Sequence, residues 1–269
     1  MLVVIRGGGD LASGIALRLY RSGMRVVICE TAEPTSIRRT VCFSEAVRLG
    51  ETTVEGVAAR LAAEKDVPDL LRQGVIPVLI DPEGRCIRSL TPDAVVDAIL
   101  AKRNLGTHID MAPIVVAAGP GFTAGEDCHA VVETMRGHYL GRVIYQGSAL
   151  PNTNIPGLIG GYAGERVLRA PADGVFQGVK QIGSHVEAGE IAGYVAGEPM
   201  VCMISGTLRG LLADHVAVKK GMKSGDVDPR CQPDHCLCAS DKALAVGGGV
   251  LEAILHFSQG KEPIPWKTK

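Results

Sequence analysis

The residues of this chain best suited to acid–base chemistry lie in the segment "AAGPGFTAGEDCHAVVETMRGH". Gly119 and Gly121 follow an apolar run, and open α/β sheets bind ligands in the loops where their strands end. His129 and Glu133 are four residues apart, so they would share one face of a helix predicted to follow the loop. We predict His129, Glu133 and His138 as candidate catalytic residues.

The same loop could hold an anion. The backbone at Gly119 and Gly121 can curl around a negative group, and we include Arg136, which comes shortly after, among the cofactor-binding candidates. The alternative for His129 and Glu133 is an ordinary surface contact, which contributes only roughly 0.2–0.5 kcal/mol.

A second glycine motif opens the chain, in "VVIRGGGDLASGIALRLYRSGMRVVICE". Gly7, Gly9 and Ala12 fit the G-x-G-x-x-G/A fingerprint of dinucleotide-binding folds, in which a strand, a tight turn and a helix hold a pyrophosphate. Glu30 follows at the tip of the next predicted strand and is placed for a ribose hydroxyl. The alternative is a glycine-rich turn that binds nothing.

Two arginines in "TSIRRT" follow this strand. The guanidinium forks of Arg38 and Arg39 suit a phosphate; the alternative is a solvated basic turn. Glu30 would repel a 2′-phosphate, which favours NAD over NADP.

Cysteine and histidine side chains, which can bind soft metal ions, are concentrated late in the chain, in "DPRCQPDHCLCASDK". Cys231, His235, Cys236 and Cys238 invite a metal interpretation, but their spacing lacks the paired C-x-x-C knuckles of structural zinc sites. We therefore expect no structural metal and favour a reactive thiol at one of these cysteines, with a pKa lowered by a neighbour such as Arg230.

Alternating strands and helices must position these groups. The hydrophobic periodicity predicts strands over 2–5, 24–29, 75–80 and 113–118 and helices over 11–20, 54–73, 92–103 and 241–257. Such alternation is typical of a parallel sheet covered on both faces, here of Rossmann-like type. The glycines of "AVGGGVLEAIL" mark a turn into the last helix or a close backbone contact.

The chain changes character after residue 150, where an internal repeat appears. A shift of 32 residues superposes "DGVFQGV" on "SGTLRGL", Gly174 on Gly206 and Val186 on Val218. Two such halves predict a pseudo-symmetric β barrel or sandwich, similar to biotinyl/lipoyl-like domains. The connecting "VAGEPMVCM" contains no lysine, so a carrier function is not expected.

Four segments follow from these patterns. We predict a Rossmann-like nucleotide- or cofactor-binding domain over 1–150, a linker over 151–165, a β-rich repeat domain over 166–230, and a cysteine-containing loop, helix and tail over 231–269 that docks on the first domain.

Composition narrows the partners and the compartment. The net charge is −1, apolar residues make up 46% and eight cysteines are present. No global field attracts nucleic acid or a membrane surface, and no apolar run is long enough to span a bilayer. We therefore expect a cytoplasmic protein with no nucleic-acid or membrane partner and with free thiols.

Taken together, "RGGGDLASGIALRLYRSG", "GPGFTAGEDCHAVVETMRGHYLGRVIYQG", "GDVDPR" and "SDKALAVGGGVLEAIL" resemble the accessory proteins of the selenium-dependent molybdenum hydroxylase system. That family is distantly similar to the xanthine dehydrogenase accessory proteins. The resemblance runs from about residue 2 to residue 257. It implies a role in maturation of a molybdenum hydroxylase, through binding or delivery of a molybdopterin-type cofactor or a nucleotide.

The resemblance also implies site residues and partners. The positions that it supports are Gly7, Gly9, Asp10, Arg38, Arg39, Gly119 to Gly121, His129, Glu133, Arg136, His138, Asp228, Arg230, Cys236, Ser240, Asp241 and Lys242. The implied partners are a molybdenum hydroxylase or other cofactor-maturation proteins, a nucleotide or pterin, and a second copy in a homodimer. Two alternatives stay open: an NAD(P)-dependent oxidoreductase with His129 or His138 as its acid–base residue, and a nucleotide-binding sensor without chemistry.

Overall fold

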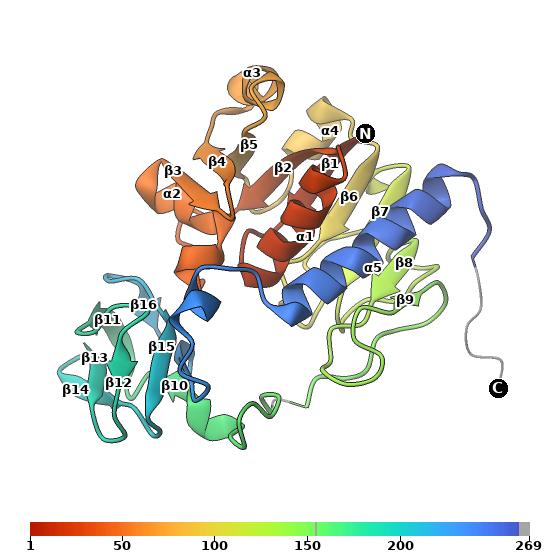
Figure 1. The fold of residues 1–269 in the computed structure, drawn as a ribbon. Helices are drawn as coiled ribbons and strands as arrows, with labels where there is room; N and C mark the ends of the chain where they lie inside the picture. The colour runs from red at the N-terminus through yellow and green to blue at the C-terminus, as the bar shows by residue number, and fades with distance from the viewer. Residues whose placement is uncertain (154, 264–269) are drawn as a thin grey trace. The chain divides into compact units, whose positions relative to one another are not determined.

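The computed structural model describes residues 1–153 and 155–263 and divides into two compact units (Figure 1). Unit 1 comprises Met1–Pro34, Phe43–Thr153 and Ala239–Lys269. Unit 2 comprises Thr35–Cys42 and Asn154–Cys238. The short segment Thr35–Cys42 therefore belongs to the same unit as the internal repeat, although it follows the second strand of unit 1.

The described part of unit 1 is built on nine strands in the order β3-β4-β5-β2-β1-β6-β7-β8-β9. The strands are β1 (Leu2–Arg6), β2 (Arg25–Glu30), β3 (Glu51–Val54), β4 (Val57–Leu61), β5 (Ile76–Ile80), β6 (Ala94–Asp97), β7 (Ile114–Ala118), β8 (Ala130–Val132) and β9 (Val143–Ile144). Neighbours from β4 to β8 pair in parallel, whereas β3 and β9 pair antiparallel at the two edges. The central strands are apolar and buried, as parallel strands covered on both faces must be.

Short helices connect these strands, and two longer ones cover the sheet. The helices of unit 1 are α1 (Asp10–Arg21), α2 (Ala46–Leu49), α3 (Val67–Arg72), α4 (Cys86–Leu90) and α5 (Asp241–Ser258), with 3-10 turns at Phe43–Glu45, Glu64–Asp66 and Ile109–Met111. Helices α1 and α5 lie side by side although they come from opposite ends of the chain (Figure 1).

Small residues allow this close approach. Between α1 and α5, a Cβ atom added to Gly14 would lie 2.5 Å from the Cβ atom of Ala243, and one added to Gly247 would lie 2.9 Å from the Gly14 carbonyl oxygen. Gly249 instead faces the turn before β9, where an added Cβ atom would lie 2.2 Å from the Gly141 carbonyl oxygen. The glycines of α5 therefore lie inside the helix, where they cost helix propensity but let backbones meet. The predicted close backbone contact is confirmed.

Unit 2 contains two four-stranded antiparallel sheets among its described residues, in the orders β10-β17-β15-β12 and β14-β13-β11-β16. The strands are β10 (Val167–Arg169), β11 (Gly174–Gly178), β12 (His185–Val186), β13 (Ile191–Val195), β14 (Glu198–Val201), β15 (Gly206–Leu211), β16 (Ala217–Val218) and β17 (Lys223–Asp228). Three 3-10 turns, at Arg39–Val41, Gly164–Arg166 and Pro233–Cys236, complete the unit.

The two halves of the repeat exchange strands. Gly174 of β11 pairs with Val218 of β16, and Gly206 of β15 pairs with Val186 of β12. These pairs are related by the same shift of 32 residues that relates the sequences. Each half therefore supplies a strand to the sheet of the other, and a shared apolar core around Phe176 and Leu208 lies between them.

The predicted strands over 2–5, 24–29, 75–80 and 113–118 are confirmed, as are the helices over 11–20 and 241–257. The predicted helix over 54–73 is confirmed only at Val67–Arg72, which form α3. It is wrong at its start, because Glu55 and Gly56 have φ of 47° and 81° and form the tight turn of a β3–β4 hairpin. The helix over 92–103 is also wrong, since Val95 and Val96 are β-branched and form strand β6.

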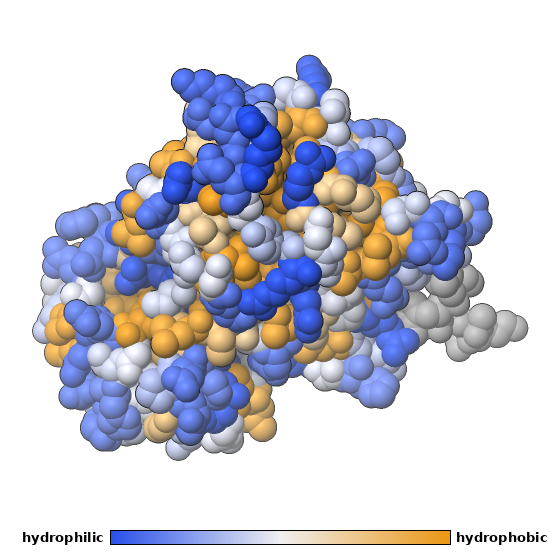
Figure 2. Space-filling view, turned by 45° about the horizontal axis from the view of Figure 1, so that its top comes forward, coloured by the Kyte–Doolittle hydropathy of each residue, from blue (hydrophilic) through white to orange (hydrophobic). Residues whose placement is uncertain are grey.

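The structure thus shows a mixed α/β architecture with one large mixed sheet and two antiparallel sheets. The Rossmann-like and biotinyl/lipoyl-like assignments and the four segment boundaries stay predictions. Within residues 1–153 and 155–263, no helix has the length and apolar character needed to cross a membrane. On the face in Figure 2, hydrophilic side chains surround smaller apolar patches.

Candidate metal centre

Two strand ends of unit 1 bring two thiols and a carboxylate together. Cys29 is near the end of β2, Asp81 follows β5 directly, and Cys86 is the first residue of α4. Strands β2 and β5 are parallel neighbours, with Cys29 opposite Leu79. Their carboxyl ends therefore meet at one edge of the sheet, the edge where open α/β sheets bind ligands.

The donor atoms are close enough to share an ion. The two Sγ atoms of Cys29 and Cys86 lie 3.4 Å apart, and these atoms and an Asp81 carboxylate oxygen all lie within 4.8 Å of one another. Two thiolates on tetrahedral zinc, each about 2.3 Å from the metal, are separated by roughly 3.8 Å. The observed spacing therefore needs little movement to accept such an ion.

The turn between Asp81 and Cys86 fixes the carboxylate. The Cys86 backbone N–H donates to Asp81 Oδ2 at 2.9 Å. Burial raises the pKa of Asp81, but hydrogen bonds from the backbone N–H groups of Gly84 to Cys86 lower it more. The pKa of this carboxyl group is therefore below its usual value. The adjacent Cys29 thiol and burial raise the pKa of Cys86 far above its ordinary value.

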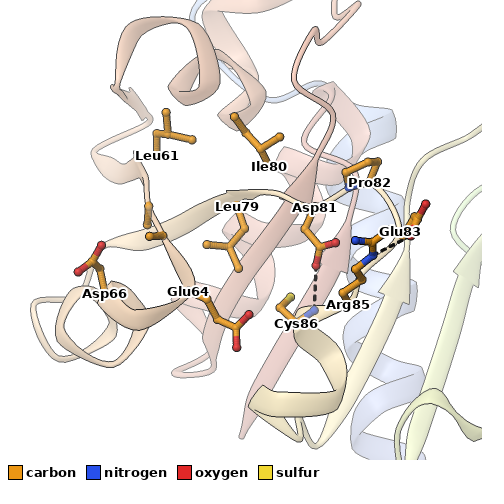
Figure 3. A pocket seen from close by; sticks show the side chains of 12 residues that line it. Leu61, Glu64, Asp66, Leu79, Ile80, Asp81, Pro82, Glu83, Arg85 and Cys86 are labelled. Carbon is orange, nitrogen blue, oxygen red and sulfur yellow. Dashed lines mark hydrogen bonds and ion pairs between the residues drawn. The ribbon is translucent and has the colours of Figure 1, made fainter.

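A pocket of about 800 Å³ opens beside these donors (Figure 3). Its lining residues are Leu61, Ala62, Ala63, Glu64, Asp66, Leu79, Ile80, Asp81, Pro82, Glu83, Arg85 and Cys86. In Figure 3 the Asp81 carboxylate points toward Cys86, and Arg85 turns to Glu83. Asp81 and Cys86 thus present their donors at the wall of a cavity large enough for a small molecule.

A buried ion pair contacts the turn that carries Asp81. The Arg6 guanidinium lies 3.5 Å from Asp97 Oδ2, and both side chains are buried. Its Nη2 donates to the Pro82 carbonyl at 3.3 Å and to the Leu105 carbonyl at 3.0 Å. Arg6 therefore joins the end of β1 to the turn that carries Asp81.

The N-terminal glycine loop of unit 1 is closed by the chain itself. The Gly8 N–H donates to Glu30 Oε2 at 2.7 Å. Glu30, which we predicted to bind a ribose hydroxyl, therefore accepts the hydrogen bond that a bound phosphate would be expected to accept. A Cβ atom on Gly7 would lie 2.9 Å from the Ala98 carbonyl oxygen. Gly9 is the N-cap of α1 and Asp10 its first residue.

The second glycine loop is also filled. A Cβ atom on Gly121 would lie 2.7 Å from Arg103 Cα, and one on Gly119 would lie 2.8 Å from the Thr134 hydroxyl oxygen. Strand β8 follows the loop, so the predicted helix carrying His129 on one face is wrong.

The predicted acid–base residues each have structural partners. Val115 N–H donates to His129 Nδ1 at 2.9 Å, and burial lowers the pKa of His129. The two Glu133 oxygens accept from backbone N–H groups of Met135 at 2.7 Å and Leu150 at 2.8 Å. The structure thus ties His129 to strand β7 and Glu133 to the backbone at Met135 and Leu150.

The remaining two predicted residues of this segment lie nearer the surface. His138 is exposed, with its ring against Tyr139. Arg136 forms a bidentate ion pair with Asp241, with N–O distances of 2.8 and 2.9 Å.

Arg38, Arg39 and Cys236 belong to unit 2. Arg38 donates to the carbonyls of His235 and Cys238, and Arg39 donates to the Leu211 carbonyl at 2.9 Å. They are therefore in a different unit from the glycine loops. Cys236 is buried, and burial raises its pKa despite the charges of Arg38 and Arg209, which is opposite to the shift expected for an activated thiol.

Comparison with known proteins adds a relative and two solved structures. No family model matches the chain. "Uncharacterized protein YqeB" of Escherichia coli K12 is 52% identical over 255 residues, which cover 94% of this chain and 47% of the relative. The chain thus spans about half the length of that curated relative.

The solved structures are far more distant. An aspartoacylase family protein from Mesorhizobium loti overlaps 84% of each chain at 8% identity and a TM-score of 0.28. A succinylglutamate desuccinylase/aspartoacylase from Rhodobacter sphaeroides overlaps 83% of this chain and 86% of its own, at 14% identity and a TM-score of 0.25. TM-scores this low do not establish a shared fold.

The molybdenum hydroxylase accessory assignment is corrected by these comparisons. Neither the name of the 52% identical relative nor the titles of the solved structures contain a molybdenum or selenium function. The maturation role, the oxidoreductase and nucleotide-sensor alternatives and the molybdopterin or NAD(P) cofactor are therefore wrong as predicted. The filled glycine loops give the physical reason, because the chain itself occupies the spaces assigned to the phosphates.

The expectation of no structural metal is corrected too, because three possible metal donors that the sequence interpretation overlooked converge in unit 1. Cys29 and Asp81 each end a correctly predicted strand, so parallel pairing alone could have placed them together. The sequence interpretation instead considered the more closely spaced cysteines Cys231, Cys236 and Cys238. Among the residues that the structure describes, only Cys29, Asp81 and Cys86 converge as such a set.

Proposed function

We propose that unit 1 contains a metal-binding centre in which Cys29, Asp81 and Cys86 hold a thiophilic divalent cation of the zinc class. Two sulfur donors and one carboxylate favour zinc over magnesium or calcium, which take oxygen ligands. The convergence of these donors within 4.8 Å at the edge of the parallel sheet carries the proposal. The order of strands around β1 and β6 supports a Rossmann-like unit that binds at this edge.

The donor number supports a reactive centre. Structural zinc sites are closed by four protein ligands, whereas catalytic sites use three and leave one position for water or substrate. When bound, such an ion would supply Lewis-acid activation of a carbonyl or of water. We therefore infer metal-assisted hydrolysis of a small molecule held in the 800 Å³ pocket.

The pocket wall indicates the kind of substrate. Glu64, Asp66 and Glu83 line it, and Arg85 is paired with Glu83. An acidic wall repels anions and accepts neutral or cationic groups. The acidic residues of the pocket then orient such a substrate next to Asp81 and Cys86, which also line the pocket.

The test uses the full chain, reduced and freed of metal with a chelator. Titration with Co²⁺ should give one equivalent bound, with the thiolate charge-transfer absorption and the intense visible bands of tetrahedral cobalt. Cys86→Ser should weaken Co²⁺ binding by about 100-fold or more, since even partners of metal ligands contribute 10–100-fold. Cys128→Ser, which alters another buried thiol of unit 1, should leave binding unchanged.

Asp81→Asn, at a half-exposed position, provides a second variant if Cys86→Ser does not fold. Cobalt absorption that survives in a Cys29→Ser, Cys86→Ser double variant would contradict the proposal. So would a reduced wild-type chain that binds no cobalt and instead oxidises to a Cys29–Cys86 disulfide.

A further inference from the structure

The two thiols of the metal centre are close enough to react with each other. The Sγ atoms of Cys29 and Cys86 lie 3.4 Å apart, and both cysteines are free thiols that are 2% exposed. In a disulfide the two sulfur atoms are about 2.05 Å apart, so an approach of roughly 1.4 Å would join them. The pair is therefore poised for oxidation as well as for metal binding.

The two sulfur atoms differ in their access to the pocket. Both cysteines belong to the apolar core of unit 1. Cys86 also lines the pocket beside Asp81 (Figure 3), whereas Cys29 is absent from the described lining. A small molecule in the pocket would therefore meet Cys86 first, with Cys29 next to it as a second thiol.

The acidic wall of the pocket selects among oxidants. Glu64, Asp66 and Glu83 line the pocket and repel anions, which include the disulfide form of glutathione. Exchange with such a disulfide also depends on access to the attacking sulfur, and Cys86 is buried. A hydroperoxide is small and uncharged, so it is the class of oxidant that this pocket admits best.

The environment of the pair keeps it reduced until oxidant is abundant. The adjacent Cys29 thiol and burial raise the pKa of Cys86 far above its ordinary value, so this thiol stays protonated at neutral pH. Because the thiolate is the nucleophile in cysteine chemistry, oxidation is slow. The pair is thus suited to a single switching event and not to continuous removal of peroxide.

We propose that Cys29 and Cys86 are a redox-sensitive pair that a hydroperoxide converts into a disulfide. Cys86 Sγ attacks one peroxide oxygen, the O–O bond breaks, and the other oxygen leaves as an alcohol or water, which leaves a sulfenic acid on Cys86. Cys29 Sγ then displaces the hydroxyl group as water and forms the S–S bond. Two thiols and one hydroperoxide give one disulfide, one alcohol and one water.

The disulfide would also remove the metal centre. Metal binding requires thiolates, and after oxidation Asp81 is the one remaining donor of the three. This loss of metal rests on the proposed metal centre, whereas the sulfur chemistry requires no metal.

The sulfur chemistry is tested on the full chain, reduced, freed of metal and treated with excess hydrogen peroxide. Mass spectrometry after proteolysis should show a cross-linked Cys29–Cys86 peptide that dithiothreitol removes. Cys128→Ser, which alters another buried thiol of unit 1, should form the same cross-link as the wild-type chain.

Single variants separate the roles of the two sulfur atoms. Cys29→Ser should stop at the sulfenic acid on Cys86, which dimedone labels when the treated chain is unfolded. Cys86→Ser should leave Cys29 unlabelled under the same conditions, because Cys29 does not face the pocket. Where circular dichroism shows that Cys29→Ser does not fold, Cys29→Ala replaces it, since alanine suits an apolar core.

The effect on the metal is measured on the zinc-loaded wild-type chain. Peroxide should release one zinc ion for each disulfide formed, and the oxidised chain should bind no Co²⁺ until it is reduced. Three results would overturn the proposal: no Cys29–Cys86 cross-link, equal dimedone labelling of the two single variants, or cobalt binding by the cross-linked chain. A chain that forms the cross-link but binds no cobalt when reduced supports the redox pair and contradicts the metal centre alone.

Discussion

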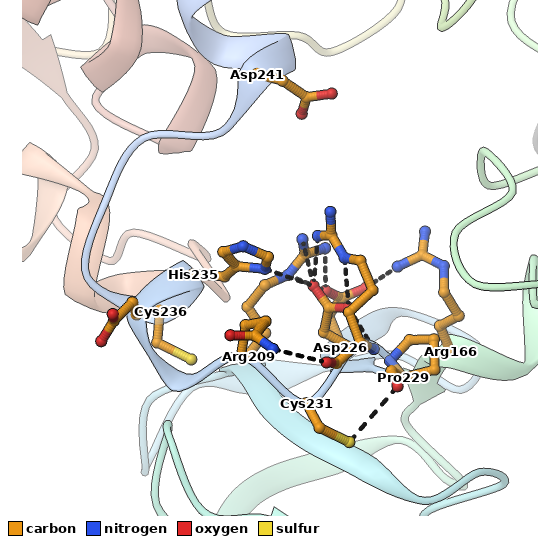
Figure 4. A network of polar contacts seen from close by, with 12 residues as sticks. Arg166, Arg209, Asp226, Pro229, Cys231, His235, Cys236 and Asp241 are labelled. Carbon is orange, nitrogen blue, oxygen red and sulfur yellow. Dashed lines mark hydrogen bonds and ion pairs between the residues drawn. The ribbon is translucent and has the colours of Figure 1, made fainter.

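The two polar clusters of this protein differ in the kind of atoms that they present. The centre at Cys29, Asp81 and Cys86 offers two sulfur atoms and an oxygen, all able to donate electron pairs to a cation. The network around Asp226 and Asp228 in unit 2 consists instead of guanidinium N–H groups that donate to two carboxylates (Figure 4). The contrast teaches that donor type and charge, rather than the number of polar residues, decide which ligand a site can take.

The clusters also differ in how the fold assembles them. Cys29 and Cys86 are 57 residues apart and meet because parallel strands end at one edge. Arg209 and Asp226 face each other across the antiparallel strands β15 and β17. The first cluster depends on a turn at the sheet edge, and the second on a strand pair, so mutations should affect them differently.

The largest expected effect comes from breaking the network of unit 2. Asp226→Ala leaves Arg166 and Arg209 buried without their carboxylate, which should lower the free energy of unfolding by about 3–5 kcal/mol. Denaturant unfolding followed by circular dichroism measures this. Asp173→Ala, which alters an exposed partner of Lys219, should be indistinguishable from wild type. Equal effects of the two changes would contradict a buried network.

The packing of α5 against the turn before β9 gives the next largest effect and concerns unit 1 alone. Gly249→Ala would place a methyl group against the Gly141 carbonyl and should cost about 1–3 kcal/mol of unfolding free energy. Gly248→Ala is a matched control, because nothing lies within 4 Å of a Cβ atom there. It should stabilise α5 by up to about 1 kcal/mol. A stabilising Gly249→Ala would show that α5 and the Gly141 backbone are not in close contact.

The two units should lose stability in different acid ranges. Burial lowers the pKa of His129 below its usual 6.5. The unfolded chain then binds more protons, so the stability that neutral His129 contributes is present above pH 6.5 and lost as the pH falls below it. Burial raises the pKa of Asp228, but the hydrogen bonds and charges of Arg230 and Arg209 lower it below 3.8, so its contribution is lost only as the pH falls below that value.

Histidine proton signals in nuclear magnetic resonance should show His129 titrating below 6.5. His129→Asn keeps an acceptor near Nδ1 and should flatten the pH dependence of the unfolding free energy around 6.5, leaving the more acidic range unchanged. A His129 pKa above 6.5 would reverse the predicted sign.

The smallest effect is expected at the rim of the pocket. Arg85→Ala removes only an exposed ion pair with Glu83, and such pairs contribute little. The cobalt affinity should stay within about threefold of wild type, because Arg85 supplies no metal ligand. A loss as large as that of Cys86→Ser would mean that the donor set is wrong.

Four central strands and the two long helices of unit 1 could be predicted from the sequence, and the reasons are local. Strands β1, β5 and β7 are apolar runs ended by Gly or Asp-Pro, and β2 is an apolar run that follows Gly23. The 32-residue repeat predicts two similar β-rich halves in unit 2. The β3–β4 hairpin was missed because Glu55 takes a positive φ, a conformation uncommon outside glycine, asparagine and aspartate.

The site was harder to predict, because its contacts are long-range. Glycine spacing matches a nucleotide loop, but the spacing does not reveal that Glu30 binds the Gly8 N–H. Arg38 and Arg39 follow β2 in sequence and yet belong to unit 2, which no local pattern indicates. The donors at Cys29 and Asp81 were predictable from strand ends, but Cys86 joins them only through the turn that carries Gly84 and Arg85.

The most direct test of the metal centre is X-ray absorption at the zinc edge of the zinc-loaded full chain. We predict two sulfur neighbours at about 2.3 Å and oxygen neighbours at about 2.0–2.2 Å, with the sulfur signal lost in the Cys29→Ser, Cys86→Ser double variant. A coordination shell without sulfur, or a sulfur signal unchanged in that variant, would contradict the account.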